Sequence, residues 1–389
     1  MTRAAGDRCA SRISWMPGST GYDARAQTAR RGAVFAFLLG AAGCDRGDIR
    51  GEKSEKAQET VKKLRRFDPS VLRADTPAAI DAEFAARFAE KRKAAEKLYR
   101  EEGGKRILKH KFGETVLPDA PLRIVCIRLE DPMLALDAPM VAAYDFPAYY
   151  LHEELAARGI MRISINDENK TINLEQVQAA KPDLIVMRDS FGKGVYDDLS
   201  KIAPVAAFDL RDYERTLLAL SLVLDRPADG EVRLRQFYDT AKRDRIRIKG
   251  HIGDATVALL RIMNKEVRLY PYATNDINRF MYELLNLRPP QMVIDIDGNE
   301  QNNAISLELL PELQTDYLLI SAGFGPSSRQ SSAIAKKRFA AMRLDPLWQS
   351  VPAVRAGHML EVDSMIWNAH GIISRERAMD ALAEDMERQ

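Results

Sequence analysis

The chain has 389 residues, enough for two domains and additional segments. Its formal net charge is only +2, which excludes a dedicated nucleic-acid-binding protein, because such proteins normally carry a large or clustered basic excess. The three cysteines, Cys9, Cys44 and Cys126, are too far apart in sequence to form a metal-binding spacing or a disulfide framework.

Residues 1–43 have the pattern of an export signal. Arg30 and Arg31 precede a short apolar run over residues 33–39, and small residues then lead to Cys44. The apolar run is too short to remain as a membrane-spanning helix. Small residues that end at a cysteine resemble a bacterial lipobox, which predicts a lipid anchor on Cys44 and an extracytoplasmic, membrane-attached protein. The alternative is a signal peptide that is cleaved without lipidation.

Residues 45–105 are rich in Lys, Glu, Arg and Ala and have helical composition. We interpret them as a charged helical tether that holds the globular part away from the membrane. The alternative, a helix that docks against the globular part, is the less favoured interpretation. No residue of this segment suggests chemistry.

Residues 106–228 alternate short apolar strands with short helices. The expected strands include residues 123–128, 141–143, 182–187 and 205–208, and amphipathic segments lie between them. This alternation predicts a mainly parallel sheet that is covered by helices on both faces.

A long helix is expected over residues 229–251, where Lys and Arg are frequent between sparse apolar residues. Residues 252–389 then repeat the earlier plan, with strands expected at 255–263, 267–270, 317–321 and 358–362. The predicted fold class is therefore α/β, with two lobes, each a mainly parallel sheet flanked by helices, joined by one long backbone helix.

A short internal repeat supports the two-lobe plan. The segment INLEQV contains Glu175, the segment ISLELL contains Glu308, and an Asp and a buried strand follow each segment at a similar distance. Asn173 and Ser306 are natural N-caps, and a carboxylate in the first helical turn is ordinary capping chemistry. Capping alone does not explain why one such glutamate stands at a matched place in each lobe.

From about residue 109 to residue 383 the chain resembles the iron-siderophore substrate-binding proteins of bacterial ABC importers, the class III group with a helical backbone. The resemblance rests on several stretches in the family's order: HKFGETVLPDAPLRIVCI, INLEQVQAAKPDLIV, YDDLSKIAPVAAFD, ISLELLPELQTDYLLIS and DPLWQSVPAVRAGHMLEVDSMIWNAHG. It implies a ligand in the cleft between the lobes. It also implies that Glu175 and Glu308 dock into arginine pockets of a permease dimer, which works with its ATPase. We expect a monomer.

The cleft residues are expected just beyond the carboxyl ends of the strands, where ligands bind in open α/β sheets. Arginines and aromatic residues dominate there, and Arg stays charged while it donates hydrogen bonds to metal-bound oxygens. Tyr150, Asn368 and His370 also follow strand ends. The residues chosen as ligand-binding are Arg128, Tyr149, Arg188, Arg261, Tyr272, Arg329 and Trp367.

Each of these residues has a structural alternative. Arg128 and Arg188 could pair with surface carboxylates, and Trp367 could pack inside its lobe. Arg261 lies within an apolar strand, where an unpaired guanidinium would be costly to bury, so a ligand role is favoured. The resemblance implies an arginine near Arg261 and an aromatic residue near Trp367.

The expected function is a receptor for a ferric siderophore, with no catalytic residues, no cofactor and no protein-held metal. The five histidines form no convergent set of metal ligands. Haem or a corrinoid stays open as an alternative ligand. An enzyme on a two-lobed scaffold is disfavoured because no phosphate-binding glycine motif is present. A receptor that serves a sensor rather than a permease is the third alternative.

Overall fold

The computed structural model describes residues 75–166, 169–272, 275–296, 303–323, 325 and 329–388, with only the backbone of residues 329–331. These residues all belong to one compact unit of the chain. The predicted signal peptide, Cys44 and most of the predicted tether lie outside the described residues. Within the part of the chain that is described, no helix is long and apolar enough to cross a membrane.

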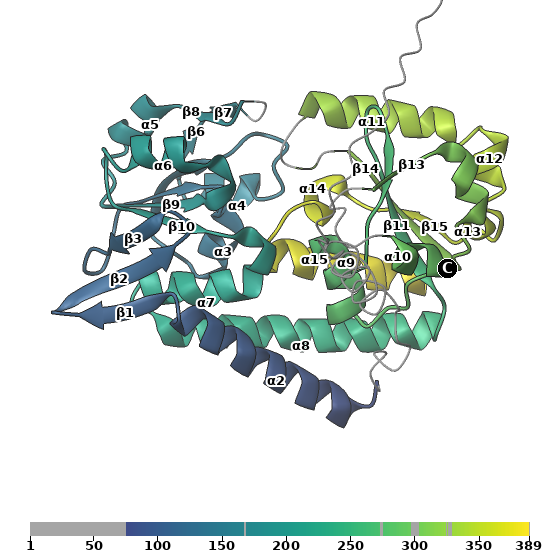
Figure 1. The fold of residues 1–389 in the computed structure, drawn as a ribbon, viewed down its shortest axis with the longest axis horizontal. Helices are drawn as coiled ribbons and strands as arrows, with labels where there is room; N and C mark the ends of the chain where they lie inside the picture. Colours follow the sequence, from purple (N-terminus) through teal and green to yellow (C-terminus); the bar gives the residue numbers. More distant parts are fainter. Residues whose placement is uncertain are drawn as a thin grey trace, which may run out of the picture. The chain divides into compact units, whose positions relative to one another are not determined.

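The first lobe is built on a five-stranded parallel sheet in the order β10-β9-β4-β5-β6, as expected (Figure 1). Its strands are β4 (Ile124–Ile127), β5 (Met140–Tyr144), β6 (Met161–Ile163), β9 (Leu184–Arg188) and β10 (Val205–Phe208). Strand β4 is buried on both faces, because Ile124 and Cys126 join one apolar cluster whereas Val125 and Ile127 join the other.

Helices cover both faces of this sheet. They are α3 (Glu130–Ala135), α4 (His152–Ala157), α5 (Leu174–Ala179), α6 (Lys193–Leu199) and α7 (Tyr213–Val223). Short 3-10 turns, η2 (Asp189–Phe191) and η3 (Leu210–Asp212), follow β9 and β10. Two small antiparallel elements complete the lobe: the ribbon β7 (Ile165–Asn166) with β8 (Thr171–Ile172), and the meander β1 (Tyr99–Glu102), β2 (Lys105–His110) and β3 (Gly113–Val116).

The expected backbone helix is confirmed as α8 (Pro227–Ile252), with Pro227 in its first turn and Lys249 and His251 in its last turn. These residue types suit the two ends of a helix and its macrodipole. Gly230 permits close packing on α7, because a Cβ atom at this position would lie 2.2 Å from Ser221 Oγ. Helix α8 also packs against α15 (Ile372–Glu387), so it contacts elements of both lobes.

The second lobe contains a mixed sheet in the order β13-β12-β11-β14-β15, not the mainly parallel sheet that we predicted. Strands β11 (Val257–Ile262), β14 (Tyr317–Ala322) and β15 (Met359–Glu361) are parallel. Strands β12 (Val267–Leu269) and β13 (Asn303–Ile305) pair antiparallel. The short connection between β11 and β12 explains the difference, because a parallel pair needs a long crossover.

The helices of the second lobe are short apart from α11 and α15. They are α9 (Asp276–Arg279), the π-helical turn η4 (Phe280–Leu284), α10 (Gln291–Asp295), the 3-10 helix η5 (Leu307–Glu312), α11 (Arg329–Met342), α12 (Pro346–Gln349), α13 (Pro352–Arg355) and α14 (Ser364–Trp367). Helix α15 closes the lobe, and it also contacts α3 of the first lobe.

The described part of the predicted tether does not act as a spacer, and this prediction is wrong from residue 75 onward. Helix α2 (Pro77–Glu96) packs against α7 and α8 and buries Ile80, Phe84 and Phe88 (Figure 1). These apolar residues recur at intervals of four, so they lie on one face of the helix. The strongly charged composition favoured the spacer interpretation over docking, although the apolar residues form a narrow stripe. Residues 99–102 belong to strand β1 instead.

Candidate ligand-binding site

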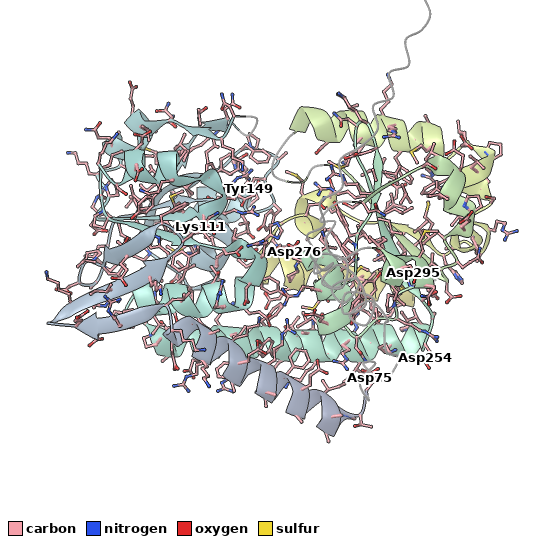
Figure 2. The ribbon with its side chains drawn as sticks, in the orientation of Figure 1. Asp75, Lys111, Tyr149, Asp254, Asp276 and Asp295 are labelled. Carbon is pink, nitrogen blue, oxygen red and sulfur yellow. The ribbon has the colours of Figure 1, made fainter. Side chains whose placement is uncertain are left out.

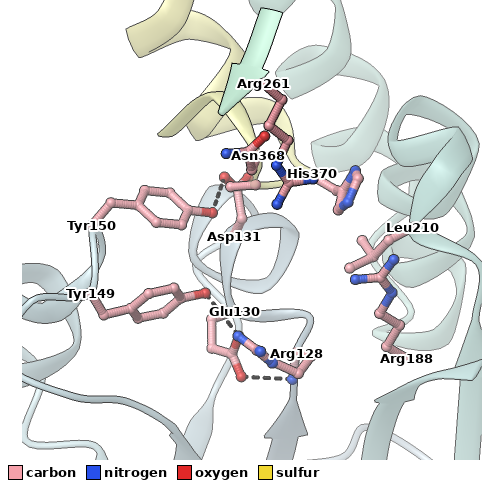
Figure 3. Close-up of a pocket in the computed structure, with 11 residues that line it drawn as sticks. Arg128, Glu130, Asp131, Tyr149, Tyr150, Arg188, Leu210, Arg261, Asn368 and His370 are labelled. Atoms are coloured by element: carbon pink, nitrogen blue, oxygen red, sulfur yellow. Dashed lines mark hydrogen bonds between the residues drawn. The ribbon is translucent and has the colours of Figure 1, made fainter. Parts of the chain in front are cut away.

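Side chains from both lobes surround one cavity of about 170 Å³ (Figure 3). Figure 2 marks Tyr149 on the first lobe and Asp276 on the second, close to this region. The lining residues of the first lobe are Arg128, Glu130, Asp131, Tyr149, Tyr150, Arg188 and Leu210, and those of the second lobe are Arg261, Asn368, Ala369 and His370. Most of these side chains are charged or polar.

Arg128 enters the cavity directly after strand β4. Its backbone adopts the left-handed region with φ of 63°, which is uncommon for a residue other than glycine. The Arg128 backbone N–H donates to Glu130 Oε1 at 2.8 Å, and the guanidinium lies 4.3 Å from the centre of the Tyr144 ring. The Glu130 carboxylate therefore helps to hold the turn that aims Arg128 at the cavity.

Glu130 is a buried carboxylate with several donors. Besides the Arg128 N–H, it accepts from the Tyr144 N–H at 3.3 Å and from the Tyr149 hydroxyl at 3.1 Å. Burial raises the pKa of Glu130 to about 7, although the Arg128 charge and these hydrogen bonds oppose the rise. Glu130 therefore changes its charge close to neutral pH.

Asp131 joins the two lobes beside the cavity. Its carboxylate accepts from the Ile373 and Ser374 N–H groups at 2.9 and 2.8 Å, in the first turn of α15, and from the Tyr150 hydroxyl at 2.9 Å. Gly371 allows this approach, because a Cβ atom there would lie 2.1 Å from Asp131 Cγ. A carboxylate of one lobe thus caps a helix of the other.

Arg188 and Arg261 reach the cavity from opposite lobes. Burial lowers the pKa of Arg188, and Asp276 only partly offsets the cost of this charge. Arg261 Nε donates to the Gly323 carbonyl and Arg261 Nη1 to the Tyr270 hydroxyl, both at 3.1 Å. With Arg128, three arginines line one cavity (Figure 3), which suits an anion rich in oxygen acceptors.

The structure brings together four of the seven predicted ligand-binding residues: Arg128, Tyr149, Arg188 and Arg261. Trp367 instead packs in the core at 2% exposure, edge-on to Phe280, so its expected place in the cleft wall is wrong. Tyr272 stacks on Tyr282 with ring centres 5.4 Å apart and is absent from the described cavity lining. The side chain of Arg329, at the start of α11, lies outside the described residues.

Sequence reasoning missed Glu130, Asp131 and Leu210, and it did not choose Tyr150, Asn368 or His370 among the residues that follow strands. Glu130 and Asp131 follow β4 after Arg128 and Leu129 and begin helix α3, so they resemble ordinary acidic residues of a first helical turn. Their position after a strand end, the same signal that selected Arg128, could have identified them.

Glu175 and Glu308 are both exposed, in the first turns of α5 and η5. The Ser306 hydroxyl lowers the pKa of Glu308, which therefore stays ionised at neutral pH.

Among the described residues, no group of three or more His, Cys, Asp or Glu side chains could hold a metal ion. The described cysteine, Cys126, is buried in β4.

Comparisons with known proteins identify relatives of this chain. The family model described as "Periplasmic binding protein" matches residues 149–365. The "Probable siderophore-binding lipoprotein YfiY" of Bacillus subtilis is 26% identical over 72% of this chain and 86% of its own length.

Two solved structures share the fold. Staphylococcus aureus SirA complexed with staphyloferrin B has a TM-score of 0.62 and 21% identity, over 72% of this chain and 98% of SirA. A periplasmic binding protein component of a Fep/Fec-like ferrichrome ABC transporter from Bacillus subtilis has a TM-score of 0.59 and 20% identity, over 72% of this chain and 100% of its own.

Proposed function

Because this chain belongs to the periplasmic binding protein family, we propose that it is an extracytoplasmic receptor that captures a ferric siderophore and delivers it to an ABC permease. The family and the curated relative are binding proteins, so the chain is a binding protein and not an enzyme. The relative's name supports the ligand class, and the ferrichrome transporter component supports the permease partner.

One observation carries the ligand proposal: Arg128, Arg188 and Arg261 converge on a single cavity from both lobes. A ferric chelate with catecholate or carboxylate groups presents several negatively charged oxygens, and guanidinium groups bind such oxygens while staying charged. The cost of burying Arg188, which Asp276 only partly offsets, is reduced when an anion enters. The mostly polar lining suits a charged chelate better than the apolar edge of a macrocycle.

We propose two further contacts with the cell envelope. Cys44 would carry the lipid anchor, and the exposed Glu175 and Glu308 would meet the permease dimer, one from each lobe. A Cys44→Ser variant should move the protein from the membrane fraction to the soluble extracytoplasmic fraction. If the variant stays in the membrane fraction, Cys44 is not the anchor.

Intrinsic tryptophan fluorescence tests the ligand proposal directly. Trp348 and Trp367 are buried in the second lobe, and Trp367 precedes the cavity residue Asn368. We expect saturable quenching by at least one of ferric enterobactin, ferric citrate and ferric staphyloferrin B, and none by the iron-free chelators at equal concentration. Haem, cobalamin and ferrioxamine B complete the panel.

Arginine variants give this experiment a matched control. Arg188→Ala should weaken binding of the ferric chelate at least tenfold, because it removes a charged hydrogen-bond donor from the cavity. Arg158→Ala removes an exposed arginine of the same lobe, which pairs with Asp137 outside the cavity, and should leave affinity unchanged. Quenching by haem or cobalamin alone, or equal affinities in the two variants, would refute the proposal.

A further inference from the structure

His370 contributes a second kind of polar group to the cavity. It lies between α14 and α15, lines the cavity, and pairs through Nδ1 with Asp276 Oδ2. Each of the two side chains keeps 18% of its surface exposed. Figure 3 shows the imidazole between Arg261 of its own lobe and Arg188 of the other. The ring is therefore held by a carboxylate on one side and faces cations on the other.

Asp276 is the ionised member of this pair. Burial opposes its ionisation, but His370 and Arg375 together hold the pKa of Asp276 well below its ordinary value. Arg375 is fully buried in α15, and its guanidinium carbon lies 4.7 Å from the centre of the Phe280 ring. Asp276 thus stays a carboxylate across the physiological range and orients the imidazole through Nδ1.

The charges around His370 oppose each other. Burial lowers the pKa of the imidazole, Asp276 raises it, and Arg188 and Arg375 lower it again. Arg261 and Asp131 line the same cavity. The pKa of the imidazole therefore lies below its ordinary value while the arginines face it. The arginines disfavour a positively charged imidazole. An anion bound among them would offset this repulsion, so that the attraction of Asp276 would then favour the imidazolium.

We propose that His370 is a further recognition residue, which takes up a proton and binds the ligand as an imidazolium, with Asp276 as its positioning residue. This inference rests on the proposed function, because it requires an anionic ferric chelate among the arginines. It also separates ligand classes: a trianionic chelate drives the proton uptake, whereas a neutral hydroxamate chelate does not.

Proton uptake can be measured by isothermal titration calorimetry of ferric enterobactin, ferric citrate and ferric staphyloferrin B at pH 7, in two buffers with different ionisation enthalpies. For the chelate that binds, wild type should take up on the order of half a proton more than His370→Gln. The chelate's own protonation cancels in this difference. Glu130 also titrates in the cavity, but it is present in both proteins and cancels likewise.

Affinity should follow the same pattern. His370→Gln should bind the chelate roughly tenfold more weakly than wild type at pH 6, and with a much smaller deficit at pH 8, where little imidazolium forms. Asp276→Asn should lose most of the extra proton uptake while it keeps His370. His152→Gln is the matched control, because His152 pairs with Asp145 at 2.8 Å and is not among the described residues that line the cavity.

The outcomes distinguish two failures. If wild type binds none of the three anionic chelates, this inference falls, and if it binds no ferric siderophore of the panel, ferrioxamine B included, the proposed function falls as well. If wild type binds a chelate but His370→Gln takes up the same number of protons, only the role of His370 is refuted. A change in His152→Gln equal to that in His370→Gln would also refute it, because the effect would then not come from the cavity.

Discussion

Glu130 and Asp131 are neighbours in sequence, but they stabilise different contacts. Glu130 holds the turn of Arg128 and receives the Tyr149 hydroxyl, whereas Asp131 caps α15 of the other lobe. Burial raises the pKa of both carboxyls, and the pKa of Glu130 reaches a value near neutrality. One turn of α3 therefore shapes the cavity and joins the lobes, and Glu130 makes the cavity charge depend on pH.

Glu130 should make stability fall as pH rises. Its pKa is about 7 in the folded protein and near 4.5 in the unfolded chain, so the folded protein binds more protons between these values. The resulting stabilisation is present below about pH 4.5 and is lost as pH rises through 7, by about 1–3 kcal/mol. Glu130→Gln should therefore be more stable than wild type at pH 8, and this advantage should disappear near pH 5.

Urea denaturation of both proteins at pH 5, 6, 7 and 8 measures this difference. The glutamine side chain introduced by this substitution can still accept from the two backbone N–H groups and donate to the Tyr149 hydroxyl, so the contacts of the turn are kept. A constant difference in unfolding free energy across the four pH values would contradict the assignment.

At the scale of elements, α2 connects the two lobes alongside α8. Arg87 makes a bidentate pair with Glu214 of α7, at 2.7 and 2.6 Å. Asp75, just before α2, accepts from Arg245 Nε of α8 at 2.7 Å and from the Asn286 side chain of the second lobe at 3.1 Å (Figure 2). The helix expected to be a spacer is thus tied to both lobes.

Loss of Arg245 should loosen the docking of α2. Its side chain is fully buried, and it also donates through Nη1 to Glu83 at 2.9 Å. Arg245→Met should lower the free energy of unfolding by about 3–5 kcal/mol, because it leaves Asp75 and Glu83 without their shared cation. Hydrogen exchange should then accelerate in α2 before the sheets are affected.

An exposed arginine of α2 provides the control. Arg92 pairs with Glu96 and Glu231 with half of its side chain in solvent, so Arg92→Met should change the free energy of unfolding by less than about 1 kcal/mol. Equal destabilisation by the two substitutions would show that the buried pairs do not secure α2.

At the scale of the whole molecule, each lobe presents one exposed glutamate in a helical first turn, Glu175 in α5 and Glu308 in η5. Neither residue lines the described cavity. Binding of the chelate and contact with the permease are therefore expected to depend on different residues, which makes the two steps separable by mutation.

Glu175→Ala/Glu308→Ala should abolish uptake of radiolabelled iron from the ferric chelate and leave its affinity for the purified protein unchanged. The reason is that charge-assisted pairs with the permease would be lost at both lobes, while the cavity is untouched. Glu153→Ala/Glu361→Ala removes one exposed glutamate from each lobe at other places and should preserve uptake. Uptake at the wild-type rate in the Glu175/Glu308 variant would favour a receptor that serves another partner.

The sequence by itself determined most strands of the first lobe and the backbone helix. Continuous apolar runs predicted β4, β5, β9 and β10 of the first lobe, and the charged and sparsely apolar run predicted α8. Asn173 marked the start of α5, where its side chain accepts from the Gln176 N–H. Strand ends also located Arg128, Tyr149 and Arg188, because the carboxyl end of a strand is a local feature of the chain. Arg261 was located instead as a charged residue within an apolar strand.

Only the tertiary structure decided which side chains reach the cavity and which pack away from it. Trp367 turns into the core while its neighbour Asn368 lines the cavity, and Asp131 finds its donors on α15, more than two hundred residues later in the chain. The docking of α2 likewise depends on buried partners in α7 and α8. Periodicity and capping are set by nearby residues, whereas these contacts depend on surfaces that meet only when the lobes pack together.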